Sequence, residues 1–336
     1  MNLESPSVRV GIIVPTWNRR VLLAEALESL RSQTLPPDQF EVIVIDDCST
    51  DDTQAMLLAF QATVPFRMVC HRLDKNVGAV PARNIAVRLT QAPVLAFTDS
   101  DCRVVPEWLA TGLGALSKNP EIGFVSGSVK NKPGQRVNFF SIGVAGGGGE
   151  DPIYPTCNIM YRSEVFWSVN GFDERAYLRN SGGVPVECAD ADLAWRCKEA
   201  GHKNLFVPEM IVYHEVRQGT VGAWLAVQMR FLMLPELLRR HEGLRERLMW
   251  WGPFCLLDNL LFYIALISAA FAITNSAWFL AGICPYIFNL LRQLNVRRTL
   301  PGLAKLIPQI ALLTARQGVI SAALIYGSFR SRWVAL

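Results

Sequence analysis

The feature that most constrains the fold is a regular alternation, between Val8 and His214, of short apolar runs with stretches of helical periodicity. Short apolar runs separated by helices are typical of a mostly parallel β-sheet covered by helices on both faces. We therefore expect an α/β fold for this part of the chain. The expected strands are Val8–Val14, Glu41–Ile45, Phe66–His71 and Val94–Thr98, and the expected helices are Arg20–Gln33, Thr50–Phe60, Ala79–Leu89 and Glu107–Leu116.

Ligands of such sheets bind beyond the carboxyl ends of the strands, so the segments that follow the strands are the candidate binding loops. Three of these segments carry polar residues: Pro15–Arg19, Asp46–Ser49 and Asp99–Asp101. The first, PTWNRR, contains no glycine, whereas a dinucleotide-binding dehydrogenase has the pattern GxGxxG at this point. We expect the three segments to meet along one edge of the sheet, and the missing glycines make a dinucleotide-binding dehydrogenase a weak alternative.

Two pairs of carboxylates occur in these loops. Asp99 and Asp101 lie two residues apart at a strand end, where they can hold Mg²⁺ or Mn²⁺ and leave positions open for phosphate oxygens. The alternative is that they only cap the next helix. Asp46 and Asp47 are adjacent and repel each other, so this pair needs hydrogen-bond donors, a cation or a ligand nearby. The residues after that pair, 49–51, could also serve only as a helix cap.

Six motifs follow one another in the order PTWNRR, EVIVIDDCSTD, NVGAVPARN, FTDSD, NGFDE and ADADLAWR. In this order and spacing they resemble the family 2 glycosyltransferases over roughly residues 8–216, about two thirds of the chain. The resemblance implies a GT-A fold, a Rossmann-like and mostly parallel sheet with helices on both faces. It also implies a nucleotide-sugar donor, with a UDP-sugar as the default.

The resemblance assigns donor-binding roles to several positions. Pro15, Thr16 and Asn18 match the loop that lies against the nucleotide base. Asp47 matches the carboxylate that accepts a hydrogen bond from the base, and Arg83 matches a basic residue near the base and the diphosphate.

The resemblance also implies a bound Mg²⁺ or Mn²⁺ ion. Asp99 and Asp101 match the DxD motif, in which the final aspartate binds the metal most directly. His214, which follows the strand-like segment Leu205–Tyr213, is similar to a histidine that some members use as a further metal or diphosphate contact. A lone histidine at a strand end can equally be structural.

The catalytic base is assigned to Asp190. The family pattern is Glu-Asp, one further residue, then Asp or Glu and Leu, whereas this chain has Ala189 in place of the first Glu. The departure leaves open what orients Asp190 and whether Glu187 stands in. Alternatively, Asp190 and Asp192 merely begin the helix that continues over Leu193–Ala200.

Together the motifs imply an inverting, metal-dependent transfer of a single sugar to a hydroxyl of a glycan or lipid-linked acceptor, with Asp190 taking the hydroxyl proton. One alternative is transfer to a polyprenyl phosphate, an acceptor that is already an anion. Another is a non-catalytic nucleotide-sugar-binding membrane protein, for which Ala189 is the sequence support. The QxxRW motif of processive synthases is not matched by QMRF at 228–231, which favours single transfer over polymerisation.

The last third of the chain differs from the rest in charge and hydropathy. Residues 1–217 contain 21 Lys and Arg against 25 Asp and Glu, whereas residues 218–336 contain 12 against 4. The basic residues there are interleaved with Trp, Phe and Leu, which argues against nucleic acid and favours a membrane surface. We therefore expect a glycosyltransferase domain over 1–217 and a helical membrane-associated region over 218–336.

A hairpin of two helices is expected over 254–291, because Asn259–Leu291 carries no charged residue and is interrupted only at 274–276. We favour a hairpin that spans the membrane; a re-entrant hairpin and a soluble helix pair are the alternatives. Arginines on either side of the hairpin place both of its ends, and the enzyme, on the cytoplasmic side. These are Arg245, Arg247, Arg292, Arg297 and Arg298.

Two further apolar stretches flank the hairpin. Trp224–Leu238 is expected to be a helix that lies at the membrane interface or packs on the catalytic domain. Leu303–Phe329 carries Lys305 and Arg316, so we expect another interfacial helix there and not a third span.

Overall fold

The computed structural model describes residues 8–143, 148–179, 185–274, 277–296 and 303–336, without the side chains of 176–187, 274–279 and 295–305. The chain forms two compact units. Unit 1 comprises Met1–Val137, Ser141–Tyr177 and Ala189–Arg217, and unit 2 comprises Asn138–Phe140, Leu178–Cys188 and Gln218–Leu336.

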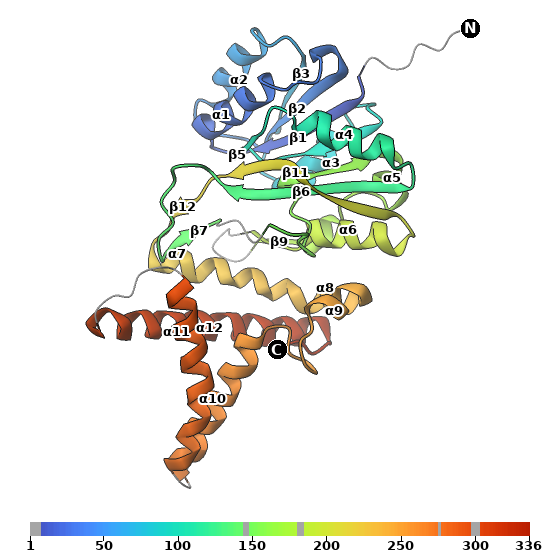
Figure 1. Cartoon of the computed structure of the whole chain (residues 1–336). Helices are drawn as coiled ribbons and strands as arrows, with labels where there is room; N and C mark the ends of the chain where they lie inside the picture. Colours follow the sequence, from blue (N-terminus) through green and yellow to red (C-terminus); the bar gives the residue numbers. More distant parts are fainter. Residues whose placement is uncertain (1–7, 144–147, 180–184, 275–276, 297–302) are drawn as a thin grey trace. The chain divides into compact units, whose positions relative to one another are not determined.

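Unit 1 is built on an eight-stranded sheet with the order β3-β2-β1-β4-β8-β6-β11-β5 (Figure 1). The β1–β2, β2–β3, β1–β4 and β6–β11 pairs are parallel, and β8 and β5 pair antiparallel with their neighbours. The strands are β1 Val10–Thr16, β2 Phe40–Asp46, β3 Arg67–Arg72, β4 Val94–Phe97, β5 Cys102–Val104, β6 Ile122–Asn131, β8 Ile159–Arg162 and β11 Lys203–His214.

Helices cover this sheet on both sides, as the apolar strands predicted. Adjacent residues of a strand point to opposite faces, and Ile12 and Ile13 of β1 are both fully buried. Leu23, Leu27 and Leu30 recur at helical spacing and pack on one face. The helices are α1 Arg20–Arg31, α2 Thr53–Gln61, α3 Ala79–Val87, α4 Trp108–Lys118, α5 Ser163–Ser168 and α6 Ala189–Glu199.

The register of the sheet brings the strand ends to one level. Thr16 at the end of β1 pairs with Asp46 at the end of β2, and Asp46 pairs with Arg72 of β3. The loops after β1, β2 and β4 therefore leave the same edge. Shorter elements of the chain are η1 Pro37–Gln39, β7 Ser141–Ile142, η2 Thr156–Asn158, η3 Glu174–Ala176, β9 Tyr177–Arg179, β10 Pro185–Glu187 and β12 Arg217–Gln218.

Unit 2 is helical, as predicted for the last third of the chain. Its main apolar core surrounds Trp224, Phe262, Tyr286, Leu290 and Leu313. Phe139 and Phe140, which come from an early part of the chain, pack on Trp224 with ring centroids 5.2 and 5.9 Å away. The helices are α7 Val221–Ala226, η4 Val227–Met233, α8 Leu234–Arg240, α9 Glu242–Leu248, α10 Leu257–Thr274, η5 Ala277–Ile283, α11 Cys284–Val296 and α12 Leu303–Ser331.

α10 and η5–α11 lie side by side as a helical hairpin (Figure 1). Two other stretches, Val221–Arg240 and Leu306–Ser331, are long and apolar enough to cross a membrane by length and composition, whereas Leu257–Ile273 of the hairpin is shorter than that test requires. Residues 275–276 of the expected turn, together with Arg297 and Arg298, lie outside the described residues, as does the Lys305 side chain.

Candidate active site

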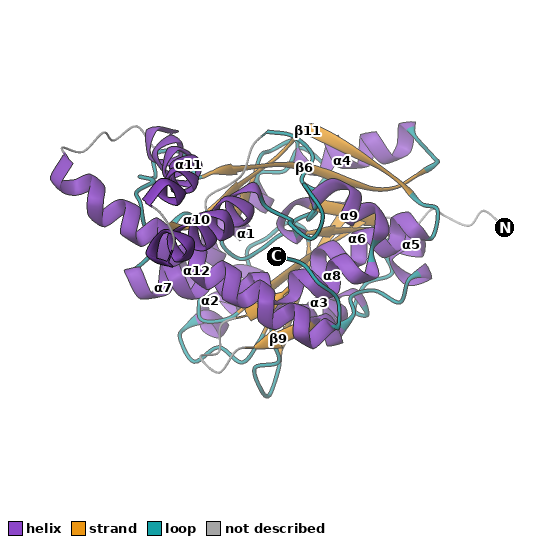
Figure 2. Cartoon of the chain, turned by 90° about the horizontal axis from the view of Figure 1, so that it is seen from below, coloured by secondary structure: helices purple, strands orange, loops and turns teal. Residues whose placement is uncertain are grey.

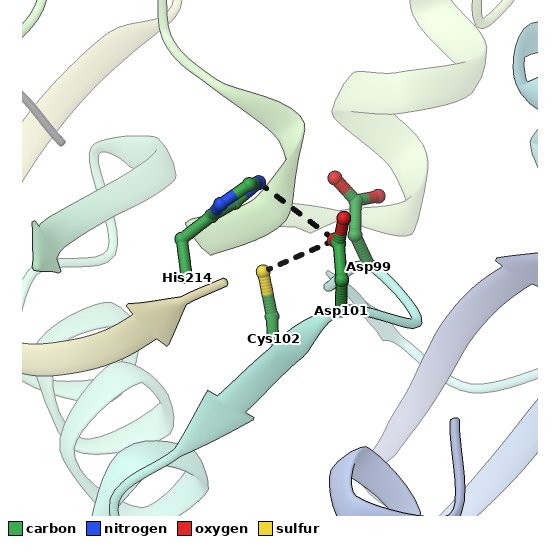
Figure 3. Close-up of side chains that lie close together, drawn as sticks. All are labelled: Asp99, Asp101, Cys102 and His214. Atoms are coloured by element: carbon green, nitrogen blue, oxygen red, sulfur yellow. Dashed lines mark hydrogen bonds and ion pairs between the residues drawn. The ribbon is translucent and has the colours of Figure 1, made fainter. Parts of the chain in front are cut away.

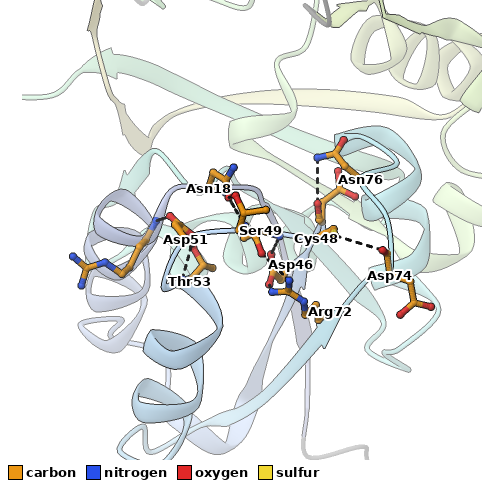
Figure 4. A network of polar contacts seen from close by, with 12 residues as sticks. Asn18, Asp46, Cys48, Ser49, Asp51, Thr53, Arg72, Asp74 and Asn76 are labelled. Carbon is orange, nitrogen blue, oxygen red and sulfur yellow. Dashed lines mark hydrogen bonds and ion pairs between the residues drawn. The ribbon is translucent and has the colours of Figure 1, made fainter.

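Asn18 links the loops that follow β1 and β2 (Figure 4). Its backbone has φ 50°, a left-handed conformation that Asn adopts more readily than most residues. Its side-chain oxygen accepts a hydrogen bond from the Thr50 backbone N–H (2.7 Å), and its own N–H donates to Ser49 Oγ (2.9 Å). The first two predicted donor-binding loops therefore hold each other in place.

Pro15 and Thr16 are the last residues of β1 and are buried, whereas Trp17 and Asn18 after them are exposed. The part of this loop that a ligand can reach is therefore at Trp17 and Asn18. Contact of Pro15 and Thr16 with a nucleotide base stays a prediction.

The adjacent carboxylates Asp46 and Asp47 are both buried, and donors satisfy both. Asp46 Oδ2 lies 2.9 Å from Arg72 Nη1. The two oxygens of Asp47 accept hydrogen bonds from the Val77 and Gly78 N–H groups, each at 2.7 Å. These donors offset the repulsion that the sequence predicted. Asp47 thereby fixes the loop that leads into α3, and its hydrogen bond to a nucleotide base stays a prediction.

Arg83 lies buried on α3 and joins two carboxylates that are distant in sequence. Its Nη2 is 2.7 Å from Asp99 Oδ1, and its Nη1 is 3.8 Å from Asp190 Oδ1. Burial raises the pKa of Asp99, but the charge and hydrogen bond of Arg83, with smaller contributions from His214 and Arg19, lower this pKa more. The net result is a pKa below the ordinary value, so Asp99 is an anion at neutral pH.

Asp99, Asp101, Cys102 and His214 form a cluster in which the possible ligand atoms all lie within 4.8 Å of one another (Figure 3). His214 Nδ1 is 2.8 Å from the Glu215 carbonyl oxygen, which can only accept a hydrogen bond. Nδ1 therefore carries a proton, and Nε2, 3.7 Å from Asp101 Oδ1, is the ring nitrogen that a metal could take. A carbonyl that fixes the tautomer is typical of metal-binding histidines.

Two carboxylates and an imidazole fit a divalent cation of the Mg²⁺ or Mn²⁺ type. The thiol of Cys102 does not add to this set. Sulfur is a soft ligand that Mg²⁺ and Mn²⁺ do not prefer, and a hydrogen bond with Cys157 and burial raise the pKa of this thiol well above the ordinary value. The predicted metal residues Asp99, Asp101 and His214 are thus brought together by the ends of β4, β5 and β11.

Arg19 occupies the same cluster, which sequence reasoning missed. Its Nη1 lies 2.6 Å from Asp101 Oδ2, so the guanidinium neutralises the carboxylate expected to bind the metal. Arg19 and Asp101 are 82 positions apart in sequence. The PTWNRR motif contains the residue, but no spacing rule connects it with the DxD motif.

Asp190 lies in the first turn of α6 and is oriented without the missing acid. Its Oδ2 accepts a hydrogen bond from the Thr156 N–H at 2.9 Å. Its Oδ1 makes no hydrogen bond to the described residues and faces Arg83. Ala189 is fully buried, so a glutamate side chain at this position would need space that the fold does not provide. The orientation that the sequence left open comes from Thr156 and Arg83.

Asp192 and Glu187 are the two acids that could replace Asp190 as the base. Asp192 is buried and forms an ion pair with Arg196, with Oδ2 and Nε 2.7 Å apart. Arg196 in turn donates to the Gly171 carbonyl, so Asp192 supports the NGFDE segment. The side chain of Glu187 lies outside the described residues.

The chain is similar to known glycosyltransferases in sequence. Residues 11–169 match the family described as Glycosyl transferase family 2. Glycosyltransferase AglE of Haloferax volcanii is 25% identical over 217 residues, which are 62% of this chain and 67% of AglE. Validoxylamine A glucosyltransferase of Streptomyces hygroscopicus subsp. limoneus is 35% identical over 106 residues, and the match spans 32% of this chain but only 23% of that relative.

Solved structures share the fold over nearly the whole chain. The mannosyltransferase PcManGT from Pyrobaculum calidifontis, in complex with GDP-Man and Mn²⁺, has a TM-score of 0.58 at 21% identity and covers 97% of this chain and 87% of its own. S. aureus TarS 1–349 in complex with UDP-GlcNAc has a TM-score of 0.52 at 17% identity and covers 97% and 93%. At these identities the likeness is one of fold, and it confirms the predicted GT-A architecture.

Proposed function

Because the chain carries a family 2 glycosyltransferase domain with the GT-A fold, we propose that it moves a single sugar from a nucleotide sugar to a hydroxyl of a glycan or lipid-linked acceptor. The proposed reaction is metal-dependent and inverts the anomeric centre. Its donor is a UDP- or GDP-sugar, since TarS and PcManGT were solved with one of each.

The observation that carries the proposal is the pair of contacts made by Arg83. One guanidinium joins Asp99 of the metal cluster, at 2.7 Å, to Asp190, at 3.8 Å. A base that must act on a hydroxyl attacking the anomeric carbon has to lie close to the group that holds the donor diphosphate. Arg83 supports that proximity with buried, charge-assisted contacts.

Direct displacement assigns a distinct task to each side chain. Asp190 keeps Oδ2 on the Thr156 N–H and uses Oδ1 to accept the hydroxyl proton as the oxygen attacks the anomeric carbon. The carbon–oxygen bond to the diphosphate breaks on the opposite face, and no sugar–enzyme bond forms. Arg83 lies beside the departing diphosphate and lends positive charge.

Asp99, Asp101 and His214 would hold the divalent cation. When bound, the cation supplies positive charge that stabilises the diphosphate as it leaves. Arg19 lies on Oδ2 of Asp101 at 2.6 Å, so Oδ1, which lies on the side of His214, is the oxygen that would bind the cation.

Membrane association completes the proposal. We assign unit 2 to the cytoplasmic face of a membrane, where nucleotide sugars are available and where a lipid-linked acceptor can be presented. The excess of basic residues over 218–336 and the apolar stretches Val221–Arg240 and Leu306–Ser331 support this assignment.

The decisive experiment is release of nucleoside diphosphate by the purified full chain across a panel of UDP- and GDP-sugars, with Mn²⁺, with Mg²⁺ and with EDTA. We expect one donor to be turned over only in the presence of a cation, and NMR to show the opposite anomeric configuration in the first product. Retention of configuration would contradict Asp190 as a base in direct displacement. Donor binding without turnover on any hydroxyl acceptor would favour the non-catalytic alternative.

A further inference from the structure

Unit 2 exposes a long apolar surface on its hairpin. From Ile264 onward, the exposed residues of α10 with described side chains are Ile264, Leu266, Ile267, Ala270, Phe271 and Ile273, all apolar. Ile273 is 87% exposed, near the turn of the hairpin. On the returning arm, Leu280 and Phe288 are exposed as well. A contiguous surface of this kind marks contact with a membrane or a partner, because water does not favour it.

The polar residues of the hairpin gather at its opposite end. The carboxylate of Asp258 accepts hydrogen bonds from Asn289 Nδ2 (2.7 Å) and Gln293 Nε2 (3.0 Å), which tie α10 to α11. Asn259, fully buried, accepts a hydrogen bond from Gln317 of α12. The hairpin therefore has a polar root fixed to α12 and an opposite end, which we call the free end, whose exposed described side chains in residues 264–273 and 280–283 are apolar.

The length of the free end limits how far it can reach. Residues 264–274 of α10 are 11 residues, which at 1.5 Å per residue extend about 16 Å. The hydrocarbon core of a bilayer is about 30 Å thick, so one leaflet is about half of that. The free end matches one leaflet and is too short to reach the far side.

α12 is apolar on two faces, and only one of them is covered by protein within unit 2. Leu313, Gln317, Ile320 and Leu324 are buried, and a Cβ on Gly327 would collide with the Leu232 carbonyl oxygen. The exposed positions up to Phe329, which is 79% exposed, fall within about 100° on the helical wheel. They are Ile307, Pro308, Ala311, Ala315, Ala322, Ile325, Tyr326 and Phe329.

Figure 2 looks along the hairpin and shows α12 crossing it, in agreement with Figure 1. A helix that crosses an inserted hairpin at its root lies along the membrane surface. This geometry accounts for the length and apolar character of α12 without a second crossing.

Exposed aromatic and basic side chains flank the helices of the root, and we call five of them the rim. Trp250 and Trp251 precede α10, Arg292 lies on α11 between Asn289 and Gln293, and Arg330 and Arg332 lie at and just after the end of α12. All five are exposed. The Trp250–Trp251 turn is fastened to the end of the chain, because the Leu336 N–H donates to the Pro253 carbonyl at 2.8 Å. Tryptophan favours the interface between hydrocarbon and water, and arginine favours anionic head groups.

We propose that unit 2 binds an anionic bilayer from one side only: the free end of the hairpin enters one leaflet, α12 lies in the interface, and the rim contacts the head groups. This rests on the membrane association proposed above and is independent of the transfer reaction. It replaces the spanning hairpin expected from sequence with the re-entrant one.

The first test is flotation of the full chain with vesicles of phosphatidylethanolamine and phosphatidylglycerol. Ile267→Asp with Phe271→Asp should weaken vesicle binding a hundredfold or more, since each aspartate is costly in hydrocarbon. Leu58→Asp in unit 1 is the matched control, because Leu58 is 60% exposed and Ile267 is 59% exposed. The control should float like the original chain, and all three should bind nucleotide equally, which shows that unit 1 is folded. Equal flotation of all three would overturn the proposal.

Replacing the rim arginines tests the head-group contact. Arg292→Gln, Arg330→Gln and Arg332→Gln should each weaken binding to anionic vesicles about fivefold and leave binding to neutral vesicles unchanged. A loss that is equal on both kinds of vesicle would contradict the assignment of the rim to anionic head groups.

Depth distinguishes one leaflet from a crossing. A spin label on Ile273→Cys, in a Cys284→Ser background, should collide with oxygen more than with a water-soluble nickel reagent. A membrane-impermeant maleimide trapped in the vesicle lumen should fail to modify the unlabelled Ile273→Cys variant, and modification from the lumen would mean that the hairpin spans. A label that remains in water, or a dimer in solution that Phe271→Asp disrupts in a chain that never floats, would assign the surface to a second copy and also remove the proposed membrane association.

Discussion

Unit 1 and unit 2 differ in which of their polar and apolar residues are buried. In unit 1, residues such as Ile12 and Ile13 are sealed between sheet and helices, and the carboxylates gather at one edge of the sheet. In the hairpin of unit 2, Asn259 is buried while Ile273 is exposed. The apolar exposure in unit 2 is the observation on which its proposed membrane association rests, and unit 1 has no counterpart to it among its strand residues Ile12 and Ile13.

The two units also neutralise their acids differently. Asp99 and Asp101 of unit 1 form ion pairs with Arg83 and Arg19, which are charged partners. Asp258 of unit 2 is held by two neutral amides of the neighbouring helix, which make a fixed structural contact. Charged partners suit a site that is proposed to bind charged ligands, and neutral amide partners suit a scaffold.

The largest effect should come from the catalytic edge of unit 1. Asp190→Asn should lower turnover by about 10²–10⁴-fold, the usual contribution of a general base, with donor affinity almost unchanged. Steady-state kinetics and calorimetric titration of the donor measure the two quantities. Glu199→Gln, at the other end of α6, removes a charge from the same helix and should keep normal turnover. Normal turnover of the Asp190 variant would move the base elsewhere.

A smaller but still large effect is expected for the metal cluster. Asp101→Ala should weaken Mn²⁺ binding at least tenfold and donor binding with it, because the cation bridges protein and diphosphate. Electron paramagnetic resonance of free Mn²⁺ measures the first effect without any turnover. Asp74→Asn, an exposed carboxylate outside the cluster, is the control. Full activity of the unaltered chain in excess EDTA would show that the cluster is not a metal site.

Substitutions at two glycines of α12 test how closely this helix packs within unit 2. Gly327→Leu should destabilise this unit by about 1–3 kcal/mol, since its Cβ would collide with the Leu232 carbonyl oxygen. Gly318→Ala, with open space around its Cβ, should be neutral or stabilise the helix by up to about 1 kcal/mol. Denaturant unfolding monitored by tryptophan fluorescence, with nucleotide affinity as the readout for unit 1, separates the units. Equal effects of the two substitutions would mean that α12 does not pack as described.

The smallest expected effect is on donor affinity when unit 2 is removed. A chain ending at Arg217 retains Asp47, Arg83, Asp99 and Asp101 and should bind nucleotide with unchanged affinity. It should lose transfer to a lipid-linked acceptor. Because Phe139 and Phe140 pack in unit 2, the matched variant replaces both with serine to keep the shortened chain soluble. Loss of nucleotide binding by both versions would show that unit 1 depends on unit 2.

The fold of unit 1 follows from its sequence where strands are short and fully apolar. Val94–Phe97 is such a strand and was predicted almost to the residue. β6, with the sequence IGFVSGSVKN, and the four-residue β8 were missed, since serine, glycine and shortness weaken the apolar signal. Their positions depend on long-range pairing, which local periodicity does not encode.

The candidate site likewise contains residues that could be assigned from sequence and residues that could not. Asp99, Asp101 and Asp190 could be assigned because motifs preserve their order in the chain. Arg19 and Thr156 could not, because one acts through an ion pair across 82 positions and the other through a backbone N–H, which any residue but proline carries. Sequence reasoning thus named the candidate reacting groups, whose roles stay predictions, and missed the contacts that orient or neutralise them.

The discontinuity of unit 2 has a consequence for synthesis. Phe140 leaves the ribosome 84 residues before Trp224, its partner in the core of unit 2. Synthesis proceeds at about 5–20 residues per second, so Phe139 and Phe140 are uncovered for roughly 4 to 17 s before the helix that contains Trp224 is made. During that time unit 1 is itself incomplete, because β11 is still being made. The nascent chain therefore exposes apolar surface for seconds, which is long enough for a chaperone to bind it or for neighbouring chains to associate.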